Sequence, residues 1–570
     1  MFILKLFLGL ILVCTFGHIS QTQAAERNSY FTSVTFLPWF NVIGGSKELK
    51  FIFADNALEG KLYYGPYSLN TPIPNLNFHK DYVEIKEGEA LLDLTKINPT
   101  YDVNRWAKDK KETLGFRVID KFGRTYFDSR VSFIFDKSIK VLPSIILGPD
   151  VNIVTDTSVL LSFTTDLAAI CSIEVSSPQG QKIEVKDAKV LTDHQFHLKG
   201  LTANTTYQYV VKNGVFEEKY FLKTAPTPGT RQPFTFTFSS DTRGATGGSE
   251  HDIYGVDAAV LKKIGALALF KKAQFIQFNG DLIEAGSPHV SHLQMRYFNW
   301  HFAIDNFTHF IPVYTTMGNY DSDANKFPTT TAEAVFAQNF INFDNGPAPE
   351  KDRYPPYKEN VYYYIYDNVA MIVLNSNYNT QSGGNVPGYI MDGQYNWFVE
   401  TLAQLQKDER IDHIFVNLHA AFFPNGGHLY EGLWHHGNNG IKPANAPKGT
   451  KGILERRDQL IDAIQNNPKV VAILTGDEHN YCRMQIGATT NLYTQNYNAE
   501  RIQIKRPFWQ ITAGSAAHSY HAQENVPWTP SVVKFSANHA LSFFHINKEN
   551  VTLEVLDLET LATLDVAKLK

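Results

Sequence analysis

Residues 234–241 read Phe-Thr-Phe-Thr-Phe-Ser-Ser-Asp, and this short segment sets the fold class of the larger part of the chain. Large apolar residues alternate with small polar ones, which is typical of a β-strand, and an aspartate follows where the strand is expected to end. A helix-like segment with apolar residues on one face follows at 256–272. Strand-like and helix-like runs then alternate, so residues 232–570 are predicted to form an α/β layered domain.

Five predicted strands of this domain each end in a polar motif. The motifs are Ser240-Asp241-Thr-Arg243, Asn279-Gly-Asp281, Gly318-Asn319-Tyr-Asp321, Asn417-Leu-His419 and Gly476-Asp477-Glu-His479. One aspartate after a strand is usually a turn or helix-cap residue, but five such motifs in order are hard to explain as caps. Because ligands bind beyond the carboxyl ends of strands in open α/β sheets, the five loops are expected to converge on one site.

The donor atoms in these motifs predict a metal centre. They are carboxylate and amide oxygens and imidazole nitrogens, and no cysteine is among them. Such donors suit divalent or trivalent iron, manganese or zinc. Asp281 lies in the middle of the set and could bridge two ions, and two ions held close together are suited to displacement at phosphorus.

The order Asp…Gly-Asp…Gly-Asn…His…Gly-x-x-His resembles that of the calcineurin-like metallophosphoesterases, and the β-rich segment before it makes the chain most similar to the purple acid phosphatase branch. The resemblance covers about residues 145–560 and implies N-terminal β-sandwich modules followed by a four-layer αββα domain. It implies hydrolysis of phosphomonoesters, with diesters as the second class of substrate, by attack of metal-bound hydroxide. It also implies two sets of ligands. One ion would be held by Asp241, Asp281 and His479, and the other by Asp281, Asn319, His419 and Asp477.

Two departures from the family pattern concern the metals. The family usually has Gly-His-x-His where this chain has Asp477, and the additional carboxylate favours iron or manganese over zinc, which stays possible. The tyrosine that gives the purple phosphatases their colour is replaced by Glu284, so no purple absorption band is expected. Glu284 is either a substitute ligand or a solvent-facing acid.

The departure that matters most for mechanism is Tyr320, which stands where the family has a histidine that aids the leaving group. Its phenol stays neutral at working pH, so another group would supply the proton, while Asp321 keeps the family's acid and would orient its neighbour. We name His436 as the catalytic histidine. The other loop histidines that stay open are His251, His289, His292, His428 and His435. Arg243 would either bind a phosphate oxygen bidentately or pair with a carboxylate of the site.

Two β-rich segments precede the α/β domain. In residues 26–140, runs that alternate polar with apolar or aromatic residues are separated by the turn-forming residues Asn, Gly and Pro. Residues 145–225 show the same pattern. The segment 201–207 resembles the corner of a fibronectin type III sandwich, in which a tyrosine hydroxyl, here that of Tyr207, is tied to nearby backbone. A Pro-rich linker at 224–229 separates the second segment from the α/β domain.

The N-terminus predicts export. A short basic start precedes the apolar run 6–16, which is too short to span a bilayer, and Thr22-Gln-Ala24 offers a small-x-small cleavage site. We therefore expect a signal peptide at 1–24, a periplasmic or secreted protein, and no membrane span in the mature chain. Only Cys171 and Cys482 then remain, and two separate buried thiols are expected.

Composition limits the classes of partner. The 570 residues carry a net charge of −5 and no long basic run, which argues against a nucleic-acid binder. The expected partner is a phosphorylated small molecule, and the oligomeric state is left open. The competing hypothesis is a surface or periplasmic binding protein with a catalytically weakened metal domain, which Tyr320 and Asp477 keep open. It predicts metal binding without turnover.

Overall fold

The structure is a computed structural model. It describes residues 39–67, 69, 81–96, 106–180, 182–244, 252–324, 326–327, 329–351, 354–381, 383–516 and 520–570. The predicted signal peptide and His251 lie outside these ranges. No helix within them combines the length and the apolar character that a membrane crossing requires.

The first β-rich segment forms two sheets around an aromatic core. The three-stranded sheet has the order β1-β2-β5, and the five-stranded sheet has the order β4-β3-β6-β7-β8. Phe40, Phe116 and Phe127 pack against one another between them. The elements are β1 (Phe40–Gly44), β2 (Glu48–Phe53), β3 (Gly60–Pro66), β4 (Tyr82–Ile85), β5 (Glu89–Asp93), η1 (Leu94–Lys96), α2 (Trp106–Asp109), β6 (Lys111–Asp120), β7 (Thr125–Phe135) and β8 (Ile139–Leu142).

The second β-rich segment is a seven-stranded sandwich with sheets β13-β10-β9 and β12-β11-β14-β15. The backbone N–H of Thr202 donates to the Tyr207 hydroxyl at 2.7 Å, which confirms the predicted tyrosine corner. Cys171 in this segment and Cys482 in the α/β domain are both buried and unpaired with each other, as expected. The strands are β9 (Ile145–Asn152), β10 (Ser158–Ala169), β11 (Cys171–Ser176), β12 (Lys182–Lys186), β13 (Leu191–Lys199), β14 (Thr206–Asn213) and β15 (Phe216–Lys223).

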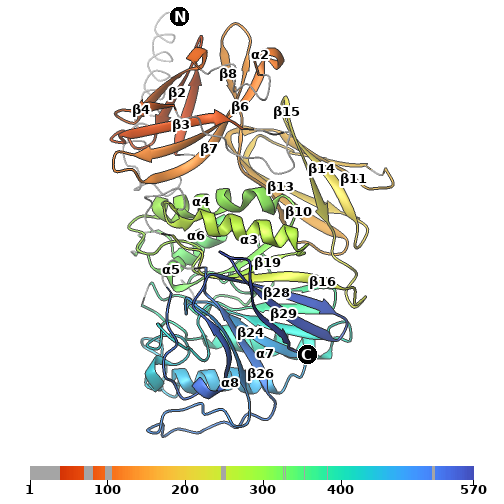
Figure 1. The fold of residues 1–570 in the computed structure, drawn as a ribbon, viewed down its shortest axis with the longest axis vertical. Coiled ribbons are helices and arrows are strands. Elements are labelled where there is room, and N and C mark those ends of the chain that lie inside the picture. The colour runs from red at the N-terminus through yellow and green to blue at the C-terminus, as the bar shows by residue number, and fades with distance from the viewer. Residues whose placement is uncertain are drawn as a thin grey trace, which may run out of the picture.

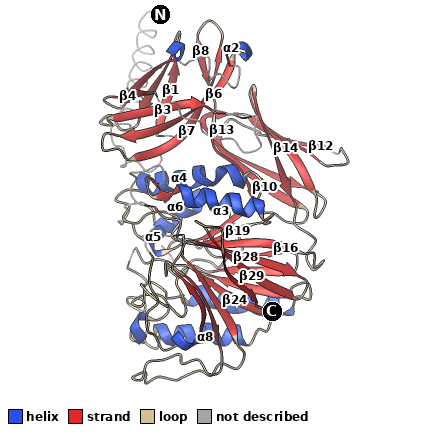
Figure 2. Cartoon of the chain, in the orientation of Figure 1, coloured by secondary structure: helices blue, strands red, loops and turns tan. Residues whose placement is uncertain are grey.

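The remaining chain has two mixed sheets packed face to face, with helices on both outer faces (Figures 1 and 2). One sheet has the order β20-β19-β16-β28-β29-β30, and the other has the order β21-β22-β23-β24-β26-β25-β27. Phe236 of the first sheet stacks on Phe544 with ring centroids 4.7 Å apart and meets Phe415 of the second sheet edge-on at 5.3 Å. Because α3 and α4 cover the first sheet and α7 and α8 the second, the predicted four-layer αββα arrangement is confirmed.

The elements of this domain follow in chain order. They are β16 (Phe234–Ser239), β17 (Asp252–Ile253), β18 (Val256–Asp257), α3 (Ala258–Phe270), β19 (Ile276–Asn279), α4 (Val290–Thr308), β20 (Val313–Thr316), α5 (Asn319–Ser322), α6 (Ala332–Asn339), β21 (Tyr362–Tyr366), β22 (Val369–Val373), α7 (Asp392–Lys407), β23 (His413–Asn417), η3 (His435–Gly437), α8 (Ile453–Gln465), β24 (Val470–Thr475), β25 (Tyr481–Ile486), β26 (Phe508–Ala513), η4 (Thr529–Ser531), β27 (Val532–Ser536), β28 (Ala540–Asn547), β29 (Asn550–Asp557) and β30 (Thr563–Lys568).

Parallel pairing brings the five motif-bearing strands to one edge. Strands β16, β19 and β20 are parallel neighbours in one sheet, and β23 and β24 are parallel neighbours in the other. Their carboxyl ends therefore lie together. The backbone N–H of Gly476 donates to the carbonyl of His419 at 2.9 Å, and that of Asp241 donates to the carbonyl of Gly280 at 3.0 Å, which ties neighbouring loops to one another.

Helix α4 is one of the elements that our sequence analysis did not predict, and its surroundings explain why. It lies between the N-terminal modules and the first sheet (Figure 1). Phe298 meets Trp39 of the N-terminal core at 5.5 Å, while Trp300 meets Phe278 of the sheet at 5.4 Å. Because the helix is buried on opposite sides, it lacks the single apolar stripe that reveals a surface helix.

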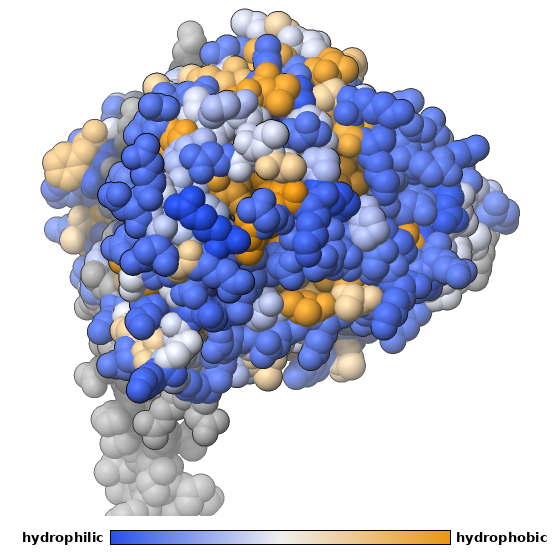
Figure 3. All heavy atoms as spheres, turned by 90° about the horizontal axis from the view of Figure 1, so that it is seen from below, coloured by the Kyte–Doolittle hydropathy of each residue, from blue (hydrophilic) through white to orange (hydrophobic). Residues whose placement is uncertain are grey.

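Buried polar contacts also join the second module to α4. The Tyr209 hydroxyl donates to the carbonyl of His309 at 2.7 Å, and the backbone N–H of Gly148 donates to Asp305 at 2.9 Å. The modules therefore pack on the α/β domain as structural partners. The opposite end of the molecule, seen in Figure 3, is mainly hydrophilic with separate smaller hydrophobic patches, as expected for a solvent-facing surface.

Candidate metal centre and active site

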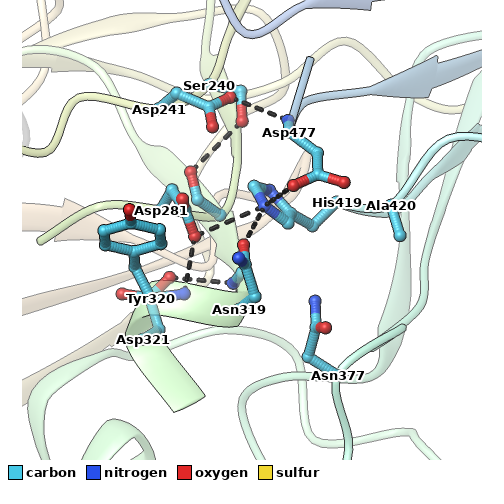
Figure 4. Close-up of polar contacts among 12 residues, drawn as sticks. Ser240, Asp241, Asp281, Asn319, Tyr320, Asp321, Asn377, His419, Ala420 and Asp477 are labelled. Atoms are coloured by element: carbon cyan, nitrogen blue, oxygen red, sulfur yellow. Dashed lines mark hydrogen bonds and ion pairs between the residues drawn. The ribbon is translucent and has the colours of Figure 1, made fainter. Parts of the chain in front are cut away.

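The six predicted metal ligands come together at the edge where the strands end. Figure 4 shows Asp281 and His419 near the middle, with Asp241, Asn319 and Asp477 around them. All are buried except Asn319, which is half-buried at the start of α5, and His479, the sixth, is buried as well.

One donor group surrounds His419. Its Nε2 lies 2.8 Å from Asn319 Oδ1, 3.3 Å from Asp281 Oδ1 and 3.5 Å from Asp477 Oδ1, while its Nδ1 contacts the carbonyl of Asn279 at 2.7 Å. Burial opposes a charge on this imidazole, yet Asp281 and Asp477 outweigh burial and hold the pKa of His419 well above its usual value. The group therefore needs positive charge, and a metal ion would supply it.

A second donor group consists of Asp241, Asp281 and His479, with one donor atom of each within 4.8 Å of the others. Asp241 Oδ1 is buried and accepts no hydrogen bond, and it lies 3.8 Å from His479 Nε2. Burial raises the pKa of Asp241 well above its usual value. An orphaned buried carboxylate oxygen beside an imidazole fits a metal ligand, because a bare carboxylate would otherwise be costly there. Asp281 belongs to both groups.

The backbone at this edge adopts conformations that are uncommon for residues with side chains. Asp241, Asp281 and Asp477 have φ angles of 63°, 50° and 71°, all in the left-handed region. Each costs on the order of 1 kcal/mol and persists only where the surroundings fix it, which is common at functional sites. A Cβ at Gly318 would collide with the Asp281 carboxylate, so only glycine allows the two loops to approach this closely.

Asp321 accepts backbone N–H groups of two neighbouring loops and holds the loop that carries Asn319. Its carboxylate accepts the backbone N–H of Gly318 at 2.8 Å and that of Leu282 at 3.4 Å, and the Tyr297 hydroxyl donates to it at 3.3 Å. It is completely buried. The structure thus places Asp321 as a positioning residue, in keeping with the orienting role that the resemblance implies.

Arg243 and Tyr320 lie on one another at the rim of the site. The guanidinium carbon is 3.9 Å from the centre of the Tyr320 ring, and the Tyr320 backbone N–H donates to Asp281 Oδ1 at 2.8 Å. Arg243 Nη1 lies 3.4 Å from Glu284 Oε2, and Nη2 lies 3.4 Å from His479 Nε2. Of the two roles expected for Arg243, the structure shows the ion pair, and its partner Glu284 is the acid that replaces the family's tyrosine.

Of the expected histidines that the structure describes, His428, one of the open alternatives, contacts the donor groups. Its Nδ1 lies 3.6 Å from Asp477 Oδ1, and its ring centroid is 5.2 Å from that of His479. His436, our choice, is exposed, and its recorded ring contact is with Tyr430 at 6.5 Å. Two others are engaged elsewhere: His435 Nε2 contacts the carbonyl of Pro387 at 2.9 Å, and His292 Nδ1 the Tyr254 hydroxyl at 2.8 Å.

Three residues near the site were not identified from the sequence. Glu431 faces His428 at 3.9 Å, and the His521 ring stacks on that of His479 at 4.5 Å. Glu478 is buried and accepts the backbone N–H groups of Asn425 and Gly426, which fixes the loop before His428. Among the described residues, those next to His428 and His521 in the sequence belong to no long helix or strand, so no periodic pattern could have placed them.

Comparison with known proteins agrees with this geometry. Residues 234–481 match the family model of the calcineurin-like phosphoesterases. No curated protein matches the sequence at a significant level. Among solved structures, the purple acid phosphatase PPD1 from yellow lupin (Lupinus luteus) seeds is 12% identical, with 94% of each chain covered and a TM-score of 0.53. This similarity indicates a shared fold.

Two further solved structures are less similar. PhoD is 14% identical, with 74% of this chain and 88% of that chain covered and a TM-score of 0.49. A dimetal phosphatase from Danio rerio is 10% identical, with 60% and 99% covered and a TM-score of 0.38. On the family model, residues 234–481 form a calcineurin-like phosphoesterase domain, and through this domain the chain is a hydrolase of the metallophosphoesterase type.

Proposed function

We propose that this protein is an exported, binuclear metal-dependent phosphoesterase that hydrolyses phosphomonoesters, with diesters as the second class of substrate. One observation carries the proposal: two groups of buried metal-binding donors meet at Asp281. Export is supported by the N-terminal sequence alone.

The donor sets indicate which residues would hold each ion. Asp241, Asp281 and His479 would hold one, and Asn319, His419 and Asp477 would join Asp281 around the other. The oxygen-rich second set favours iron or manganese, with zinc as a third choice. When bound, two such ions supply an activated water and neutralise the charge that develops on phosphorus.

The protein's own groups hold and orient the substrate. We propose that the guanidinium of Arg243 donates two N–H groups to a phosphate while its face packs on the Tyr320 ring. Burial raises the pKa of the Tyr320 phenol above its usual value, so this phenol stays neutral and serves as a hydrogen-bond donor.

The binding-protein hypothesis keeps one supporting observation, the neutral Tyr320 in place of the family's histidine. It predicts that the ions bind and that no ester is turned over. Both hypotheses therefore expect metal, and turnover separates them.

The test is hydrolysis of p-nitrophenyl phosphate and bis(p-nitrophenyl) phosphate by the metal-free full chain after reloading with iron, manganese or zinc separately. Metal-dependent turnover that Asp281→Asn abolishes is the expected result, because Asp281 serves both donor groups. The ratio of monoester to diester rates assigns the subclass. Bound metal without turnover of either ester would refute the proposal and leave the binding-protein hypothesis.

A further inference from the structure

A third cluster of possible metal ligands lies next to the pair, formed by His428, Glu431 and Asp477. One donor atom of each lies within 4.8 Å of the others. His428 Nδ1 is 3.6 Å from Asp477 Oδ1, and His428 Nε2 is 3.9 Å from Glu431 Oε1. His428 and Glu431 belong to neither donor group described above.

The His428 imidazole has an unsatisfied nitrogen. The residue is only 8% exposed, and its Nδ1 is buried without a hydrogen-bond partner. A buried nitrogen 3.6 Å from a carboxylate is too far for a hydrogen bond and is costly to leave unpaired. A cation between the two groups would satisfy both of them.

Neighbouring contacts hold His428 in this position. Glu478 accepts the backbone N–H groups of Asn425 and Gly426, and Glu524 accepts that of Gly427 at 2.9 Å. Gly427 has a φ angle of 86°, and a Cβ there would collide with the His521 ring. These contacts fix the loop, and they therefore also fix the orientation of the His428 side chain.

The replacement of an imidazole by Asp477 makes a shared ligand possible. Asp477 Oδ1 stands between His419 Nε2 at 3.5 Å and His428 Nδ1 at 3.6 Å. A carboxylate has two oxygens and can bind two cations, whereas an imidazole offers a metal one nitrogen while the other is engaged. A histidine at 477, as the family usually has, could not serve in this way.

We propose that His428, Glu431 and Asp477 hold a third divalent cation beside the pair, with Asp477 shared between the third ion and its neighbour. The proposal rests on the proposed function, since it takes Asp477 to be a ligand of the pair. Glu431 adds a negative charge to that of the shared Asp477 at this position, and a mixed nitrogen and oxygen set suits Mn²⁺ or Zn²⁺.

The test counts ions. The full chain is stripped with a chelator, reloaded with Mn²⁺ or Zn²⁺ and desalted, and the ratio of metal to protein is measured by inductively coupled plasma mass spectrometry. We expect three ions per wild-type chain and two in Glu431→Gln, in His428→Gln and in Asp477→His. Glu500→Gln makes the same charge change at an exposed position and should retain three. Circular dichroism shows which variants fold, and either Glu431→Gln or His428→Gln suffices.

Each result separates the third ion from the pair. Two ions in the wild type and two in Glu431→Gln would overturn the third site and leave the binuclear proposal intact. Two ions in the wild type and one in Glu431→Gln would make Glu431 a ligand of the pair and would also overturn it. One ion or none in the wild type would refute both proposals together.

Discussion

Replacing Arg243 with lysine tests the part of the active site that we propose to recognise phosphate. Among the described residues, every polar contact of the Arg243 nitrogens is 3.4 Å or longer, and Nε makes no hydrogen bond. The side chain is 12% exposed. The guanidinium therefore lies over Tyr320 while its N–H groups make only long contacts. Exchanging these contacts for hydrogen bonds to a phosphate oxygen would cost little free energy.

The expected magnitude comes from the number of donors that survive. Arginine can offer a phosphate two parallel N–H donors, whereas lysine keeps the charge but offers a single ammonium. One charge-assisted hydrogen bond contributes about 1.5–3 kcal/mol. Its loss corresponds to an increase in KM of about 10- to 150-fold. Because the bound substrate and the transition state would both lose this hydrogen bond, kcat should change little.

The assay is steady-state hydrolysis of p-nitrophenyl phosphate by the metal-loaded wild type and Arg243→Lys. The matched control is Arg231→Lys, since Arg231 also contacts a carboxylate, that of Asp412, through two nitrogens but lies just after the linker 224–229. The control should leave KM within about 2-fold of the wild type. A KM for Arg243→Lys within that same range would show that Arg243 does not hold phosphate and that its ion pair is purely structural.

Three further predictions concern positioning and stability. Asp321→Ala releases the loop of Asn319 and should weaken metal affinity by about 10- to 100-fold, measured by isothermal titration calorimetry. Burial raises the pKa of Glu359 from 4.5 to about 7, so the stability that its neutral form contributes is present below pH 4.5 and is lost as pH rises through 7. Glu359→Gln should therefore raise the melting temperature at pH 8 by about 2–3 °C, from roughly 3 kcal/mol over about 1.2 kcal/mol/K, and leave it unchanged near pH 4.5. Phe236→Ala empties the contact between the two sheets and should lower the melting temperature by about 3–4 °C, whereas Phe270→Ala, at a residue 78% exposed, should not.

Each of these predictions has an opposite outcome. Unchanged metal affinity in Asp321→Ala would mean that Asn319 does not need its loop fixed. An equal shift of Glu359→Gln at both pH values would assign the effect to packing instead of ionisation. Equal melting temperatures for Phe236→Ala and Phe270→Ala would contradict the face-to-face packing of the sheets.

The strands and the ligand motifs were the parts of the fold that the sequence could reveal. Buried parallel strands are short apolar runs, and each ends where the chain must supply polar groups to a loop. The alternating segment before Asp241 is the strand β16 (Phe234–Ser239), as predicted. The motif residues follow these ends directly, so topology alone brought them together.

The sequence could not reveal the segments whose apolar residues follow no regular spacing. Helix α4 is buried on opposite faces, and its first residue is preceded by His289, which makes no side-chain cap hydrogen bond. The approach of His428 and Glu431 to Asp477 depends on how a long loop folds back. Arg243 presented two reasonable roles, and only its distances to Glu284 and Tyr320 show how it is engaged without substrate.

The burial of α4 has a consequence for the order in which the chain can fold during synthesis. The core around Trp39 and Phe127 is completed by Phe298 of that helix, some 260 residues later in the sequence. The first module ends at Leu142, 156 residues before Phe298, so at a synthesis rate of about 5–20 residues per second it waits roughly 8–30 s with this apolar face uncovered. Until α4 arrives, the nascent chain presents the surface that holdase chaperones bind.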